Sequence, residues 1–254
     1  MKKSNIILLI VSGGIFLVGL GIFAVGLNMA DWNWVKLDDT QLVSQQYVAT
    51  SQEIDSLDGI EITSNVNIKL QYGEGLTVDY WGNPDISNKI AFVKQGILTI
   101  DVNYSKSWAI WGNPFEGIKV ANAEIVVTIP QSVELNMSIK TTNCRLTVDQ
   151  LRAKKISLSS KDAKVSLNNI DADDMSISVK DAKAELNNID VDNMSIDIKD
   201  ANMQLNLVGK HSDYNIAVVV KDGKSNISSQ YSPIATKNLS ATVRNGKLNT
   251  QWNA

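Results

Sequence analysis

The residues of this chain that could do chemistry recur at regular intervals. Asp162, Asp181 and Asp200 each follow a lysine and precede an alanine, and they are spaced 19 residues apart. Asp222 continues the series after a longer interval. Carboxylates that lie close together repel one another unless cations sit between them, and their oxygens suit Ca²⁺. The series is therefore a candidate Ca²⁺ site; the alternative is that the preceding lysines neutralise the acidic side chains and the aspartates cap turns.

Aromatic residues form a second candidate site, for ligand binding. Trp81 and Trp111 each begin the tetrapeptide Trp-Gly-Asn-Pro, and Trp108 and Phe115 flank the second copy. Proline cannot donate to a strand ladder, so both copies are expected to be loops. Exposed aromatic faces bind sugars or protein partners, or rest on lipid headgroups. The alternative is that these loops cap the first rung of the fold and cover a sheet edge.

Catalysis has little support in the sequence. The chain holds a single histidine, His211, and no serine or cysteine motif beside a base. Asp171 and Asp173 could serve as the acidic pair of a polysaccharide-cleaving enzyme, but acidic turns are common in soluble repeat proteins. The net charge of -3 and the pI of about 5.2 argue against a nucleic-acid partner. We therefore predict a protein that is not an enzyme and needs no cofactor beyond the weak Ca²⁺ hypothesis.

The elements that must position these residues follow from the same repeat. In one unit, Val165 and Leu167 alternate with polar residues, and Met175 and Ile177 do so again, which predicts two short strands. Equivalent strands of successive units would stack in parallel at about 4.7–4.9 Å. A repeat this short indicates stacked units that are unstable singly. The predicted fold is all-β, a single-stranded β-solenoid resembling a parallel β-helix, with rungs of about 19 residues.

The position after each Asp or Asn is always small, which indicates a structural turn. Asp-Gly and Asn-Gly pairs favour tight turns because both residues tolerate positive φ. We interpret the column as the corner of each rung, where a large side chain would not fit. Its members are Cys144, Ala163, Ala182, Ala201, Gly223 and Gly246.

The N-terminus predicts a membrane anchor. Lys2 and Lys3 precede residues 6–30, a run of 25 residues without a charge that is long enough for a helix to cross the hydrocarbon core. The lysines place the N-terminus in the cytoplasm. We expect a cytoplasmic stub at 1–5, a transmembrane helix at 6–30, a spacer at 31–55 and an extracytoplasmic solenoid at 56–254. A cleaved signal peptide is the alternative, although the apolar run is longer than such peptides need.

Several of these features together resemble a known family. The Lys-Lys start, the apolar helix, the segment Leu57-Asp58-Gly59-Ile60-Glu61-Ile62 and the final turn Arg244-Asn245-Gly246-Lys247-Leu248 are similar to the bacterial "putative-adhesin" family. The resemblance covers residues 55–252. It implies a membrane-anchored or secreted β-solenoid, and some members of the family occur with envelope-stress regulation. It implies no functional residues.

The expected function is a non-enzymatic, adhesin-like scaffold on the cell surface that binds an envelope component or a protein partner. An envelope-stress regulator acting on a membrane partner through its helix is the alternative, because the Gly-rich helix could pack closely against another. A polysaccharide-active enzyme is the third hypothesis. All three place the folded domain outside the cell membrane.

Overall fold

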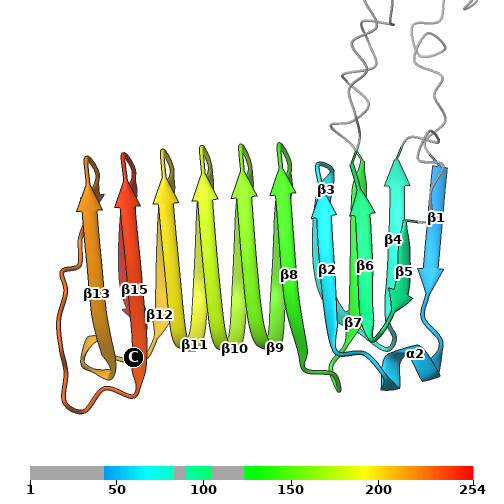
Figure 1. Ribbon diagram of the computed structural model, residues 1–254, viewed down its shortest axis with the longest axis horizontal. Helices are drawn as coiled ribbons and strands as arrows, with labels where there is room; N and C mark the ends of the chain where they lie inside the picture. Colours follow the sequence, from blue (N-terminus) through cyan, green and yellow to red (C-terminus); the bar gives the residue numbers. More distant parts are fainter. Residues whose placement is uncertain (1–42, 83–89, 104–122, 254) are drawn as a thin grey trace, which may run out of the picture. The chain divides into compact units, whose positions relative to one another are not determined.

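The computed structural model describes residues 43–82, 90–103 and 123–253. The described residues of the compact unit Leu42–Ala254 are mostly in β-strands (Figure 1). Within these described ranges, one short α-helix, α2 (Ser51–Asp55), and one 3-10 helix, η3 (His211–Asp213), accompany the strands. The strands are β1 (Val43–Val48), β2 (Gly59–Ser64), β3 (Asn67–Gly73), β4 (Thr77–Gly82), β5 (Ala91–Lys94), β6 (Ile97–Val102), β7 (Glu124–Pro130), β8 (Leu135–Thr142), β9 (Arg145–Lys161), β10 (Lys164–Lys180), β11 (Lys183–Lys199), β12 (Asn202–Val208), β13 (Tyr214–Lys221), β14 (Lys224–Ser225), β15 (Lys237–Arg244) and β16 (Lys247–Asn253).

The three central repeats form three parallel rungs in register. Val165 of β10 pairs with Ala184 of β11 and with Leu146 of β9, so the 19-residue period is also the hydrogen-bonding register. Each rung is one 17-residue strand, whereas the sequence predicted two short strands per unit. The strand bends without ending because a residue with positive φ, such as Asn169 (54°) or Asn188 (55°), absorbs the change of direction.

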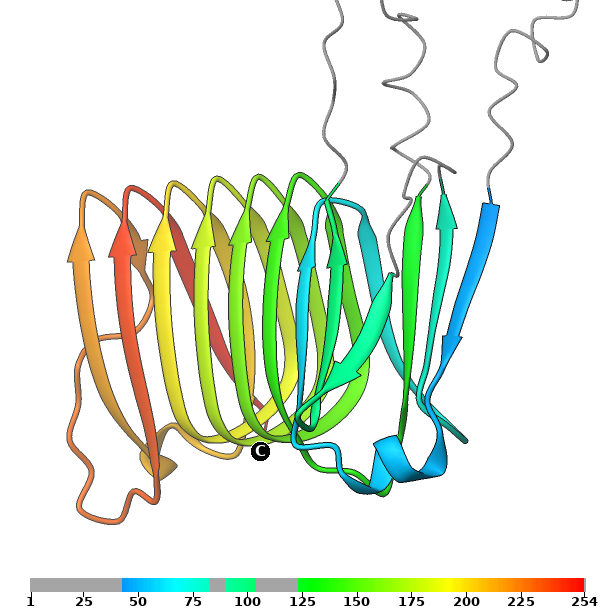
Figure 2. The ribbon, with the colours of Figure 1, turned by 45° about the vertical axis from the view of Figure 1, so that its right-hand side comes forward.

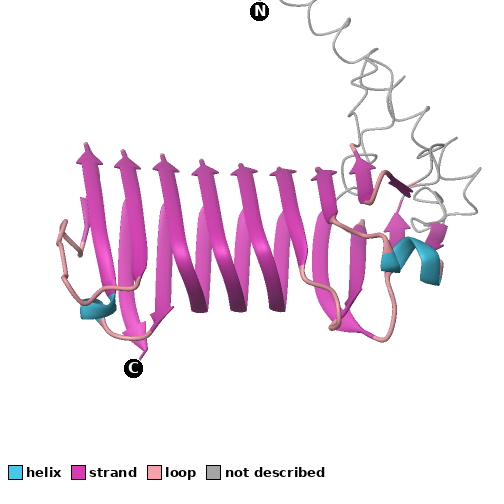
Figure 3. Cartoon of the chain, turned by 60° about the horizontal axis from the view of Figure 1, so that its bottom comes forward, coloured by secondary structure: helices cyan, strands magenta, loops and turns pink. Residues whose placement is uncertain are grey.

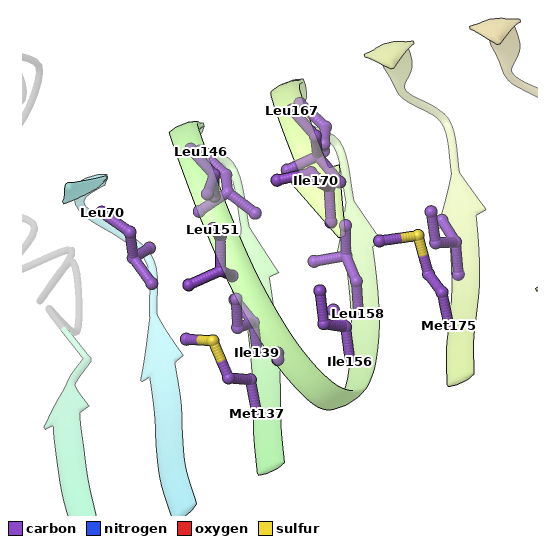
Figure 4. Packing of buried hydrophobic residues seen from close by; sticks show 14 of the residues in the cluster. Leu70, Met137, Ile139, Leu146, Leu151, Ile156, Leu158, Leu167, Ile170 and Met175 are labelled. Atoms are coloured by element: carbon purple, nitrogen blue, oxygen red, sulfur yellow. The ribbon is translucent and has the colours of Figure 1, made fainter. Parts of the chain in front are cut away.

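The bent rungs build two layers that share a core (Figures 1 and 2). Layer 1 has the order β5-β6-β2-β8-β9-β10-β11-β15-β13, and layer 2 has the order β1-β4-β7-β3-β9-β10-β11-β12-β16-β14. The C-terminal halves of β9 to β11 belong to layer 1 and their N-terminal halves to layer 2. Alternate apolar side chains point between the layers, where Leu146, Leu167 and Met175 pack with their neighbours (Figure 4).

At both ends of the coil the spatial order of the rungs differs from the sequence order. Pairing places β15 between β11 and β13, and β16 between β12 and β14. Asn245 therefore neighbours Asp200, and the prediction that Asp222 is the next member of the stack was wrong. At the other end, β2 lies between β6 and β8. Residues 226–236 give the chain enough length to pass over the outer rung and return.

The N-terminal end is closed by antiparallel strands and a helix. β1 and β4 pair antiparallel, as do β4 and β7, and β5 and β6. β1 and α2 fall within 31–55, the segment predicted to be a spacer, so the folded unit begins earlier than expected. β1 is mostly exposed along its length, so it lacks the apolar alternation that would have revealed it. A capping box between Thr50 and Glu53 begins α2.

The predicted transmembrane helix, residues 6–30, lies outside the described residues. Within the part of the chain that the structure describes, no helix is long and apolar enough to span a bilayer. Both described helices lie along the edge of the coil at which the rungs bend (Figure 3).

Candidate functional site

The repeated turns line one edge of the coil, which we call the turn edge. It comprises residues 142–145, 161–164, 180–183, 199–202, 221–224 and 244–247. In every turn the Asp or Asn adopts positive φ, from 50° at Asp181 to 55° at Asn143. The residue after it packs against the neighbouring rung: a Cβ on Gly246 would lie 2.4 Å from the backbone oxygen of Ala201. This contact explains why the structural turn column is small.

The acidic series on this edge pairs with basic and amide groups. Lys161 Nζ lies 3.7 Å from Asp162, and Lys180 Nζ lies 3.9 Å from Asp181. The Asn245 amide donates to Asp200. Among the described residues, no cluster of three or more His, Cys, Asp or Glu side chains could hold a metal ion. The calcium interpretation of Asp162, Asp181, Asp200 and Asp222 therefore lacks a ligand cluster, and the neutralised turns fit the contacts better.

Of the predicted aromatic site, the structure describes only Trp81. It is the last residue but one of β4, near the turn edge, and is 49% exposed. The prediction that the first Trp-Gly-Asn-Pro copy is a loop was therefore wrong for Trp81 and Gly82, which continue the strand because the proline comes only after them. Trp108, Trp111 and Phe115 lie outside the described residues, so whether they join Trp81 stays a prediction. Both aromatic segments connect to the fold at the turn edge. Gly82 precedes the first segment. The second segment follows the end of β6, which lies opposite Ser64, and precedes Ala123. The Ala123 carbonyl accepts a hydrogen bond from the Asn67 backbone N–H.

A surface trough on layer 1 was not predicted. Two hollows of about 530 and 260 Å³ lie on this layer and share Lys155. We call the two together the serine trough. Its floor is a row of serines on paired strands, so successive members are one strand spacing apart, about 4.7–4.9 Å. The row consists of Ser138, Ser157, Ser176, Ser195 and Ser240. The recurrence of Met-Ser-Ile in the sequence was the available signal.

Polar side chains form the border of the serine trough near the bends. Asn193 donates to Asp174 (3.2 Å), Asn238 to Asn193 (2.9 Å) and Asn215 to Asn238 (3.4 Å). A side-chain amide has two N–H donors and two acceptor lone pairs. Each of these asparagines uses one N–H donor along the ladder, which leaves its second N–H donor outside the ladder bonds. Gln230 closes the C-terminal end of the trough.

The remaining reactive side chains have structural surroundings. Cys144 is 9% exposed, and burial raises the pKa of its thiol to about 11, so it is protonated at neutral pH. The His211 ring packs edge-on against Trp252 at a centroid distance of 5.1 Å. Asp171 lies 3.6 Å from Arg152. These contacts place no nucleophile beside a base at any of the three positions.

The architecture defines the class of protein: a two-layer β-solenoid whose rungs stack mostly in parallel. More particularly, the chain belongs to the family described as Toastrack DUF4097, whose model matches residues 57–249. This confirms the family resemblance. No curated protein matches the sequence.

Solved structures with a similar outline are distant in sequence. One from Bacteroides fragilis, described as a "putative adhesin", is 14% identical, with 84% of this chain and 98% of that chain covered and a TM-score of 0.49. Another from Clostridium sporogenes, described as a "putative cell adhesion protein", is 13% identical, with 84% and 100% covered and a TM-score of 0.41. Neither likeness is strong enough to carry an argument about function.

Proposed function

We propose that the chain is a membrane-anchored, extracytoplasmic scaffold, not an enzyme, that binds an extended component of the cell envelope along the serine trough. The observation that carries this proposal is the row of paired serines that crosses two adjacent hollows, which share Lys155. A small-molecule site would need convergent groups in one enclosed pocket. Here the same groups repeat on successive rungs, which suits a linear ligand.

The chemistry of the serine trough favours a polymer rich in hydroxyl and amide groups. Serine hydroxyls both donate and accept hydrogen bonds, and the bordering asparagines keep unused donors and acceptors. Because the serines on the floor of the trough are small, a polymeric ligand has room to approach the sheet. A glycan whose repeat is close to the strand spacing would place equivalent groups over successive rungs, so many weak hydrogen bonds would add up.

Filling the serine trough tests the proposal. Ser176→Trp should abolish co-sedimentation of the protein with purified, insoluble cell-wall polysaccharide. Ser166→Trp is the matched control, because it lies on the same rung but faces outward from layer 2. Equal retention of both variants, with unchanged circular dichroism, would contradict trough binding.

The aromatic hypothesis requires a separate variant. If Trp81, Trp108, Trp111 and Phe115 form the ligand surface, Trp108→Ala with Trp111→Ala should lower polysaccharide binding at unchanged stability. If they cap the first rung, the same pair should lower the thermal midpoint and leave binding per folded molecule unchanged.

A further inference from the structure

Charge is segregated between the two edges of the coil. The six turns of the turn edge carry ten basic and four acidic side chains, a net charge of +6. The opposite edge, where the rungs bend, is acidic. The bends of the three central rungs (149–155, 168–174 and 187–193) carry six acidic and three basic side chains, a net charge of -3. A chain with a net charge of -3 thus presents a basic strip.

Exposed ion pairs neutralise only part of this strip. Arg244 contacts Asp197 at 2.6 Å, and Lys183 contacts Glu185 at 2.7 Å. Such surface pairs are weak and are screened by salt. Lys199, Lys221, Lys224 and Lys247 make no salt bridge within the described part of the chain, so their charges are available to a partner.

The route of the chain links this strip to the predicted anchor. β1 begins at Val43, opposite Gly82, which is at the turn edge. Twelve residues, 31–42, separate the end of the predicted transmembrane helix from Val43. Fully extended, they span at most about 40 Å. An anchored domain is therefore held near the bilayer by the same edge that carries the basic strip.

Trp81 lies near the same edge as the basic row, three strands away from Arg145. It pairs with Glu124, which pairs with Asn67. The Asn67 side chain accepts a hydrogen bond from the Arg145 backbone (3.0 Å), and Arg145 pairs with Lys164. A half-exposed tryptophan on the edge that also carries a basic row is a combination found at membrane interfaces, where the ring sits at headgroup level.

From these observations we infer that the turn edge is a lipid-facing surface, and that it rests on the anionic headgroups of the bilayer in which the chain is anchored. The inference depends on the membrane anchorage of the proposed function. The serine trough lies in the half of layer 1 nearer the bends, so it stays accessible to an envelope polymer in this orientation. Attraction between basic side chains and an anionic surface acts within a Debye length, about 10 Å at 0.1 M salt.

The test uses the full chain reconstituted into vesicles of phosphatidylcholine, with or without one third phosphatidylglycerol. An amine-reactive reagent labels exposed lysines, and mass spectrometry compares Lys164, Lys183 and Lys224 with the bend-edge residues Lys154 and Lys155. Labelling of the turn-edge lysines should fall several-fold in anionic vesicles at low salt and recover at high salt. Labelling of the bend-edge lysines should not change.

A charge-reversal variant checks the cause. Lys164→Glu combined with Lys183→Glu and Lys224→Glu should abolish protection of Lys199 and Lys247, whereas Lys154→Glu with Lys155→Glu should preserve it. If the chain floats with the vesicles but the lysines of both edges are labelled equally in both vesicle types, the inference is overturned. Failure to float with phosphatidylcholine vesicles would instead overturn the anchorage, and with it the tether on which this orientation depends.

Discussion

Replacing Gly246 with alanine tests whether close contact between rungs at the turn edge shapes this fold. The new Cβ would lie 2.4 Å from Ala201 O, 2.9 Å from Ile198 Cγ2 and 3.2 Å from Ala201 N. Two of these atoms are backbone atoms and cannot rotate away. Lys247 N also donates to Ala201 O at 2.9 Å, so moving the turn outward would lengthen a ladder hydrogen bond. The substitution must therefore strain one rung or weaken its pairing.

Overpacking of this kind costs about 1–3 kcal/mol. For a domain of this size, each 1 kcal/mol lowers the melting temperature by about 2–4 °C. We therefore expect Gly246→Ala to lower the midpoint by about 2–12 °C, measured by thermal circular dichroism and calorimetry. Gly75→Ala is the control, because nothing lies within 4 Å of its new Cβ. It should leave the midpoint unchanged or raise it slightly. An unchanged midpoint for Gly246→Ala would refute the packing argument.

Three further predictions address the amide ladder, the buried thiol and the acidic series. Asn187→Ala should lower the free energy of unfolding, measured in urea, by about 1–3 kcal/mol. The reason is that the Asn187 amide donates to Asn168 (3.0 Å) and accepts from Asn206 (2.7 Å). A loss of stability no larger than that of the exposed Ser178→Ala variant would contradict this prediction. The thiol of Cys144 contributes full stability below pH 9 and loses it as the pH rises toward its folded pKa of about 11, so Cys144→Ala should flatten the stability profile over that interval. Adding EDTA should leave the melting temperature unchanged, and a fall that Ca²⁺ reverses would restore the calcium interpretation.

The central rungs could be predicted from the sequence because they repeat. Val165, Ala184 and Leu146 are equivalent in the sequence and are partners in the structure, since identical units stack in register. Inward and outward residues follow from alternation alone. The single bent strand in each rung was not predicted, because Asn168-Asn169 reads equally well as a turn and as a bulge.

At the C-terminal end of the coil the sequence repeat does not predict the spatial order of the rungs. The copy at Asn245 is closer in space to Asp200 than the copy at Asp222, although it comes later in the chain. Sequence order carries no information on which of two similar rungs pairs with β11. The order is set by the total free energy of hydrogen bonding and apolar burial of β13 and β15. The connection at residues 226–236 is long enough to allow it.

What the sequence determined by itself was the rung: its length, its apolar face, its small corner and the family. Local patterns encode these features because each depends on neighbours within one repeat. The tertiary structure decided the order of the outer rungs, the serine trough and the separation of basic turns from acidic bends. Each of these arises when positions from many rungs come into line, so hydroxyls, amides and charges 19 or more residues apart act as one surface.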